Sequence, residues 1–212
     1  MKKYILLLAL LLSSTTFAVE PKFNDNFKQT KNEIETSSPG KIEVLELFWY
    51  GCIHCYSMDP YLDKWADSLP DDVVFKRVPA IPRKSWVPGA KAYFAIETLG
   101  LEGKLHEKLF DAIHKEKDVD PNNEAALISW VTLNGKLDQK EVKAAFNSFS
   151  IDTKLKKSYK IFKDAGATGV PTIIIDGNYM TSSTMAGGEQ NAIDITNYII
   201  ENIRNNRKKT SE

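Results

Sequence analysis

The stretch IEVLELFWYGCIHC, residues 42–55, decides the fold of this chain. Residues 42–50 are rich in β-forming side chains and apolar at most positions, which predicts a central strand that is buried on both faces. A helix is predicted next, because apolar residues recur at spacings of four, three and four: Met58, Leu62, Trp65 and Leu69. Cys52 and Cys55 therefore lie where a buried strand passes into a helix.

The segments on either side of this stretch differ in their periodicity. A second β-type run covers residues 73–78, and a strand hairpin is predicted over residues 173–180, with Asp176-Gly177-Asn178 as its turn. From Ser85 to about Ser158 the apolar residues recur with the helical period, and no strand is predicted there. A last amphipathic helix is predicted over residues 193–203.

Length and composition fit one globular domain that carries an insertion. The chain has 212 residues, 42% of them apolar, with 28 basic and 28 acidic side chains. A net charge of zero argues against nucleic acid as a partner, and a mean hydropathy of −0.32 argues against a polytopic membrane protein. We expect an α/β domain in two pieces, residues 19–81 and 159–212, interrupted by an all-helical domain at residues 82–158.

The first 18 residues predict a secretory signal peptide. Lys2 and Lys3 precede an apolar run of nine residues, Tyr4 to Leu12, and Thr16 and Ala18 fit the −3 and −1 positions of a cleavage site. The run is far shorter than the roughly 20 apolar residues that a membrane-spanning helix needs. We therefore expect cleavage after Ala18 and export from the cytoplasm.

Spacing and position indicate that the cysteine pair is chemical. Export favours disulfides, but the loop between Cys52 and Cys55 is so short that closing it stabilises the fold very little. At the start of a helix, Cys52 faces unpaired N–H groups and the positive end of the helix dipole, which favour a thiolate. His54 can add positive charge or a hydrogen-bond donor. A stabilised thiolate makes the disulfide an oxidant of other thiols.

The cysteine pair has three other interpretations. A zinc site needs four ligands, and the chain has no second cysteine pair, so His106 and His114 would have to fold back to complete it. Covalent haem attachment needs a histidine where this chain has Tyr56. An inert surface disulfide stays open. Because they lie on stretches rich in lysine and glutamate, His106 and His114 are expected to face solvent.

Three features together resemble the DsbA family of periplasmic thiol:disulfide oxidoreductases. They are the sequence FWYGCIHCY at residues 48–56, the sequence GVPT at residues 169–172 and the helical block between them. The resemblance extends over nearly the whole chain after residue 18. It implies a thioredoxin fold that is interrupted by a helical domain.

The resemblance also implies roles for individual residues. Cys52 would be the exposed nucleophile, Cys55 its buried partner and His54 the residue that tunes the thiolate. Pro171 would be a cis-proline beside the disulfide, and Val170 would offer backbone hydrogen bonds to a bound peptide. This chain departs from the best-known members in having Ile53, not proline, before the histidine, so their reduction potential does not transfer to it.

Glu46 is a carboxylate in the middle of the apolar strand, six residues before Cys52, where the family has a buried acid. Its expected role is to accept or relay the proton of Cys55, with a pKa raised by burial. The alternative is a glutamate that faces an edge or forms an ion pair. The lysine with which the family pairs this acid has no clear match around residues 75–77.

The resulting expectation is a periplasmic dithiol oxidase. It would pass its Cys52–Cys55 disulfide to unfolded, newly exported proteins through a mixed disulfide on Cys52. The resemblance implies that a DsbB-type membrane quinone reductase reoxidises it, and that it holds no bound cofactor or metal; a monomer is expected. A net reductase or isomerase, and a peptide-binding chaperone with an incidental disulfide, are the alternatives.

Overall fold

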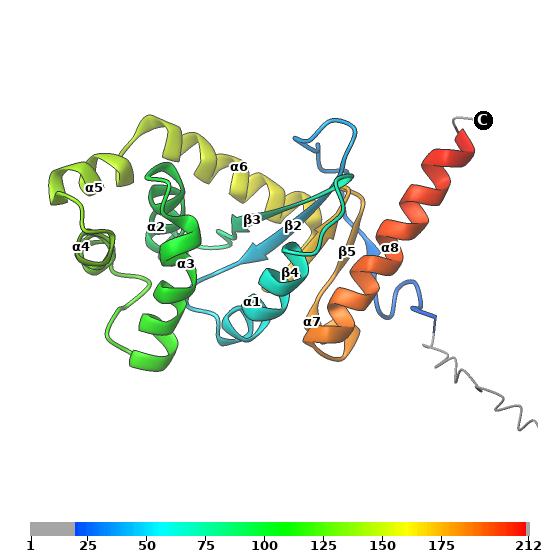
Figure 1. Ribbon diagram of the computed structural model, residues 1–212, viewed down its shortest axis with the longest axis horizontal. Helices are drawn as coiled ribbons and strands as arrows, with labels where there is room; N and C mark the ends of the chain where they lie inside the picture. The colour runs from blue at the N-terminus through cyan, green and yellow to red at the C-terminus, as the bar shows by residue number, and fades with distance from the viewer. Residues whose placement is uncertain (1–19, 211–212) are drawn as a thin grey trace, which may run out of the picture.

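The computed structural model describes residues 20–210, which form a five-stranded sheet with helices on both of its faces (Figure 1). The strands are β1 (Lys28–Gln29), β2 (Ile42–Phe48), β3 (Val73–Pro79), β4 (Thr172–Ile175) and β5 (Tyr179–Thr181). Their order in the sheet is β1-β5-β4-β2-β3, with β3 parallel and β4 antiparallel to β2. The predicted signal peptide and its cleavage after Ala18 lie outside the described residues.

Strand β2 lies between β3 and β4, and every one of its residues is buried. Because side chains alternate along a strand, its two faces pack against different helices. Val44 belongs to a hydrophobic cluster with helices α1 (Ile53–Ala66) and α8 (Glu189–Thr210). Leu45 packs in a second cluster with helix α6 (Phe149–Ala165). This cover on both faces accounts for the nearly continuous apolar sequence of the strand.

The segment between β3 and α6 contains helices and no strand within the described residues, as the helical periodicity predicted. The helices are η1 (Lys84–Trp86), α2 (Val87–Thr98), α3 (Glu102–Asp111), η2 (Ala112–Glu116), α4 (Glu124–Gly135) and α5 (Gln139–Phe146). Figure 1 shows them gathered at the end of the sheet toward which β2 points. Their hydrophobic core is continuous with that end, because one cluster joins Leu105 and Phe146 to Phe48 and Cys55.

The predicted α/β class and the predicted hairpin are confirmed, since β4 and β5 pair in antiparallel register. Helix α8 is longer than the predicted residues 193–203. Helix α6 is continuous across the boundary predicted between residues 158 and 159, because its buried face runs from Ile151 to Ala165. A short helix, α7 (Ser183–Ala186), connects β5 to α8.

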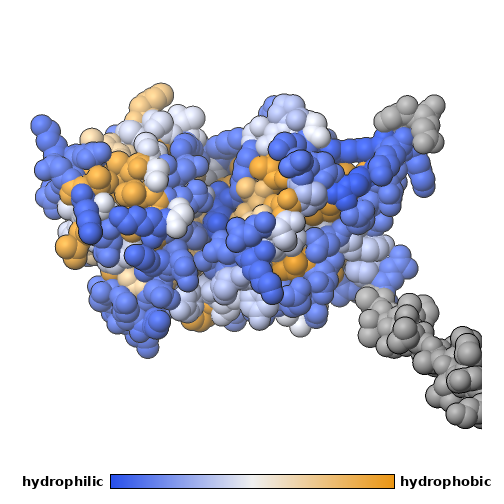
Figure 2. Space-filling model, viewed as in Figure 1, coloured by the Kyte–Doolittle hydropathy of each residue, from blue (hydrophilic) through white to orange (hydrophobic). Residues whose placement is uncertain are grey.

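The surface is mostly hydrophilic in the view of Figure 2, with apolar patches over the inserted helices and beside α8. Leu133 and Phe149 are among the large apolar side chains that are exposed. Within residues 20–210, no helix combines the length and the apolar character needed to cross a membrane.

Candidate active site

The two cysteines lie at the junction of β2 and α1, where the sequence placed them. Strand β2 ends at Phe48, and the chain turns through a hydrogen bond from the Cys52 amide to the Trp49 carbonyl of 2.9 Å. Cys52 is then the N-cap of α1, with extended backbone angles, and Cys55 lies in the first turn. Both are free thiols, Cys52 partly exposed and Cys55 buried. The helix start therefore presents one sulfur and hides the other.

The surroundings of the two sulfurs separate their acidities. A hydrogen bond from the Cys55 side chain, helped by the backbone amides of Cys55 and His54 and by the charge of His54, outweighs partial burial and lowers the pKa of Cys52 to about 6. Burial, the hydrogen bond to Cys52 and the charge of Glu46 raise the pKa of Cys55. At neutral pH the pair therefore favours a thiolate on Cys52 beside a thiol on Cys55.

The loop before β4 approaches Cys52 from the far end of the sequence. Cys52 Sγ lies 3.4 Å from the carbonyl oxygen of Val170, to which the protonated thiol donates a hydrogen bond. The Val170–Pro171 peptide bond is cis. The site thus joins two segments that are separated by more than half of the chain.

Glu46 is buried within β2, on the face that packs against α1. Its neighbour in the register on β3 is Arg77, whose Nε lies 3.4 Å from Glu46 Oε2. Neither carboxylate oxygen accepts a hydrogen bond within the described residues. Burial, opposed by the charge of Arg77 and reinforced by Asp59 and Asp63, raises the pKa of Glu46 to about 8. The acid is ion-paired and central rather than at an edge, and its cation is Arg77, one of residues 75–77, instead of a lysine.

The match to known proteins is extensive. A sequence model of the DSBA-like thioredoxin domain family matches residues 75–198. The thiol:disulfide interchange protein DsbA of Pseudomonas aeruginosa is 33% identical over 97% of this chain and 99% of its own length. Its counterpart from Azotobacter vinelandii is 34% identical over 86% of this chain and 85% of its own length.

The chain belongs to the DsbA family.

Solved structures agree with this assignment. The crystal structure of P. aeruginosa DsbA matches with a TM-score of 0.81 at 33% identity, covering 90% of this chain and 98% of that one. The Xylella fastidiosa oxidoreductase DsbA also matches with a TM-score of 0.81, at 28% identity, covering 87% of this chain and 98% of that one. The predicted thioredoxin fold with inserted helices is confirmed, and the protein is a thiol:disulfide oxidoreductase.

The prediction that His106 faces solvent is wrong, and His114, which was expected to do the same, is only partly exposed. His106 is only 5% exposed, and its ring nitrogens bond to Tyr50 Oη at 2.8 Å and to Asp59 Oδ1 at 3.1 Å. His114 Nε2 lies 2.7 Å from the Tyr50 carbonyl oxygen, and its ring stacks on Tyr56. The neighbouring lysines and glutamates, from which the exposure of the two histidines was predicted, lie on the outer face of the helices.

One signal in the sequence could have placed His106. It stands at the first position of an i, i+3, i+4, i+7 series that continues with Leu109, Phe110 and Ile113. That spacing puts all four side chains on one helix face, and the other three are apolar. A polar residue in such a series is buried with a partner, which here is supplied by Tyr50 and Asp59.

A stacked pair of tryptophans near the cysteines was not predicted. Trp49 and Trp86 stack with ring centroids 4.2 Å apart and planes within 4°. A Cβ atom at Gly51 would come within 2.4 Å of the Trp49 ring, so glycine is required for this close approach. Ile53, directly after Cys52, is 53% exposed. The reactive Cys52 is therefore bordered by apolar side chains.

Metal binding has no support from the described residues. Among residues 20–210, no three histidine, cysteine or acidic side chains come together in a way that could hold a metal ion. The histidines that a zinc site would have needed, His106 and His114, are instead engaged with Tyr50.

Proposed function

We propose that this protein is a periplasmic dithiol oxidase that donates a Cys52–Cys55 disulfide to newly exported proteins. The observation that carries the proposal is the asymmetry of the pair. Cys52 is partly exposed at the helix start with a pKa of about 6, while Cys55 is buried with a raised pKa. The stable thiolate favours the reduced enzyme, so the disulfide gives up its oxidising equivalents readily.

The reaction consists of two thiol–disulfide exchanges. A substrate thiolate attacks Cys52 Sγ, the Cys52–Cys55 bond breaks, and Cys55 leaves with the electron pair and takes up a proton. A second substrate thiolate then attacks the substrate sulfur of the mixed disulfide, and Cys52 leaves as a thiolate. The substrate loses two electrons and the cysteine pair gains them.

Four further residues have roles in this proposal. Glu46, whose pKa of about 8 lets it hold or release a proton near neutral pH, exchanges that proton with Cys55. His54 stabilises the Cys52 thiolate. Val170 offers its backbone to a bound peptide, next to the cis-proline Pro171 and within hydrogen-bond distance of Cys52.

The wider setting is part of the same proposal. Residues 1–18 are a signal peptide that is cleaved after Ala18, and the clients are unfolded proteins that contain cysteines. A DsbB-type membrane quinone reductase reoxidises the reduced pair, and the protein acts as a monomer without a bound cofactor. The thioredoxin-like domain comprises residues 19–81 and 159–212 and the inserted domain residues 82–158, with helix α6 continuous across the second boundary.

Two cysteine variants test the proposal. The oxidised protein is mixed with a reduced, unfolded protein that has two cysteines, and disulfide formation is followed by mass. We expect Cys52→Ser, which cannot form the disulfide, to be inactive. Cys55→Ser also lacks the disulfide, so its Cys52 is first converted to a mixed disulfide with glutathione; a client with a single cysteine should then displace glutathione as a thiolate and remain linked to Cys52. Full activity of Cys52→Ser would overturn the mechanism. Equilibration with glutathione supplies the second measurement, because a strongly reducing potential would favour a reductase instead.

A further inference from the structure

A chain of buried polar groups connects the proposed proton-exchanging acid to the inserted helices. It runs from Glu46 on β2 to Arg77 on β3, on to Asp59 on α1, then to His106 on α3, and ends at Tyr50. The successive contacts are 3.4 Å, 3.0 Å, 3.1 Å and 2.8 Å. Apart from Arg77, whose side chain is 10% exposed, these side chains are at most 5% exposed. Solvent therefore screens these charges poorly, so a change of charge at one end alters the electrostatic potential at the other.

One proton position along this chain follows from the chemistry of Asp59. Burial raises the pKa of Tyr50 far above its usual range, so its hydroxyl stays protonated beside His106 Nδ1. Because a carboxylate can only accept, His106 carries a proton on Nε2 and donates it to Asp59. Although burial opposes it, hydrogen bonds and charges from His106 and Arg77 lower the pKa of Asp59, which is a carboxylate. Phe48 and Phe110 pack edge-on against the His106 ring and hold it in place.

Arg77 divides one positive charge among three acids. Its Nη2 bonds to Asp59 and Asp63, whereas its Nε only approaches Glu46. Arg77 Nε and both Glu46 oxygens are buried without a hydrogen bond to any of the described residues. The aspartates and Glu46 thus compete for the guanidinium. The more strongly Asp59 attracts it, the less its positive charge stabilises the ionised form of Glu46.

We propose that His106 is a positioning residue for Glu46: by donating its Nε2–H to Asp59, it satisfies part of that carboxylate and keeps the Arg77 guanidinium beside Glu46. This inference rests on the proposed role of Glu46 in proton exchange with Cys55. It assigns the inserted helices a part in the chemistry, because α3 supplies the histidine.

The consequence of losing the donor has a definite sign. Without His106, Arg77 is the remaining side-chain partner of Asp59 within the described residues, and the guanidinium is drawn toward Asp59. Glu46 then faces the negative charges of Asp59 and Asp63 with less compensation, and the pKa of Glu46 rises further. Cys55 on the same helix face would transfer its proton to Glu46 only at higher pH. Removing the charge of Asp59 would release Arg77 toward Glu46 and act in the opposite direction.

The test follows the ionisation of Glu46 in two ways across pH. One readout is the infrared carbonyl band of its protonated carboxyl group, assigned by its loss in Glu46→Gln. The other is the rate at which oxidised glutathione reoxidises the reduced protein. We expect His106→Leu to move both midpoints upward by about one pH unit, and Asp59→Asn to move them downward. His106→Gln, whose amide N–H can reach Asp59, should stay close to the parent protein.

Each outcome decides the proposal. Unchanged midpoints in His106→Leu, or shifts of the same sign in His106→Leu and Asp59→Asn, would overturn it, because general damage moves both variants alike. If His106→Leu does not fold, an unchanged or raised midpoint in Asp59→Asn overturns it instead. In a Glu46→Gln background, His106→Leu should leave the reoxidation profile unaltered. A parent protein without oxidase activity but with the expected infrared shifts would refute the proposed function and leave this inference intact.

Discussion

Glu43 and Glu46 lie three residues apart on the same strand, both have at most 2% of their surface exposed, and their pKa values are shifted in opposite directions. On the α6 face of the sheet, Glu43 Oε2 accepts hydrogen bonds from Ser37, Ser38 and Lys76. These bonds outweigh burial and lower the pKa of Glu43. On the α1 face, Glu46 has an ion pair with Arg77 but no hydrogen bond from residues 20–210, and its pKa rises to about 8.

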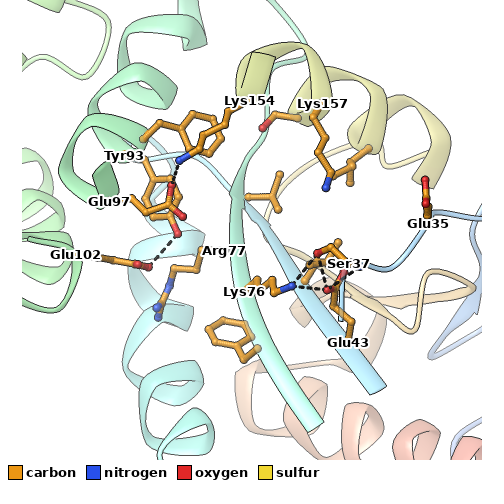
Figure 3. Close-up of a pocket in the computed structure, with 16 residues that line it drawn as sticks. Glu35, Ser37, Glu43, Lys76, Arg77, Tyr93, Glu97, Glu102, Lys154 and Lys157 are labelled. Carbon is orange, nitrogen blue, oxygen red and sulfur yellow. Dashed lines mark hydrogen bonds and ion pairs between the residues drawn. The ribbon is translucent and has the colours of Figure 1, made fainter. Parts of the chain in front are cut away.

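The difference arises from the pleat of the two strands. Lys76 and Arg77 are consecutive on β3, so their side chains leave opposite faces of the sheet. Figure 3 shows Lys76 with Ser37 around Glu43, while Arg77 extends from the other side of the strand. A carboxylate that accepts several hydrogen bonds stabilises the fold, whereas one that accepts none can gain or lose a proton near neutral pH. The comparison suggests that β2 carries a structural acid on one face and a reactive acid on the other.

The largest expected effect comes from removing the two cations. Arg77→Met leaves Asp59 buried without its cation and should lower the free energy of unfolding by about 3–5 kcal/mol. Lys76→Met should lower it by about 1 kcal/mol, because the lysine is partly exposed and two serines still bond to Glu43. Urea unfolding at pH 7 measures both. Equal losses would remove the distinction between the two faces.

The second effect is an opposite dependence of stability on pH. The pKa of Glu46 is raised, so its contribution is present below its usual value of 4.5 and is lost as the pH rises through about 8. The pKa of Glu43 is lowered, so its contribution is present above 4.5 and is lost as the pH falls through the folded value. In the oxidised protein, where Cys52 does not titrate, Glu46→Gln should gain a few kcal/mol over the parent at pH 9, at about 1.4 kcal/mol per unit.

Glu43→Gln is the matched control for that experiment. It should lose stability at neutral pH and flatten the acid side of the profile, leaving the alkaline side unchanged. The profiles come from unfolding free energies measured between acid and alkaline pH. Alkaline stabilisation by both variants would mean that both glutamates are protonated in the folded state.

A smaller effect is expected on the redox reaction. Glu46→Gln removes the group that exchanges a proton with Cys55, so reoxidation of the reduced protein by oxidised glutathione should slow by about tenfold or more, with a flatter pH profile. Glu43→Gln should react at the parent rate, since Glu43 lies on the other face of the sheet. Stopped-flow tryptophan fluorescence follows the reaction. A parent-like rate in Glu46→Gln would exclude proton exchange through this acid.

The smallest effect is expected from removing a single hydroxyl that bonds to Glu43. Ser37→Ala removes one of the hydrogen bonds to Glu43 and should lower the free energy of unfolding by about 1 kcal/mol. The reoxidation rate should not change. Ser150→Ala is the control and should have no measurable effect, because the Ser150 hydroxyl is exposed and bonds to Ser148. A larger loss in the control would show that serine removal itself is destabilising.

Local patterns in the sequence predicted much of the site. The strand of residues 42–50 and the following helix depend on neighbouring residues, so they could be assigned without a fold, and they fix Cys52 at a helix start. Arg77 could not be identified as the partner of Glu46, because that pairing depends on the register between β2 and β3. The burial of His106 depends on the packing of α3 against Tyr50, which is distant in sequence.

The sequence by itself determined where the reactive sulfurs lie and which segments form the sheet, since these follow from short-range periodicity and spacing. The tertiary structure alone decided that Glu43 accepts hydrogen bonds and that Glu46 is left to titrate near neutral pH. The physical reason is that the ionisation of a buried carboxyl depends on desolvation and on donors brought in from other elements. Those donors are chosen by strand register and helix packing, which no local stretch of the chain specifies.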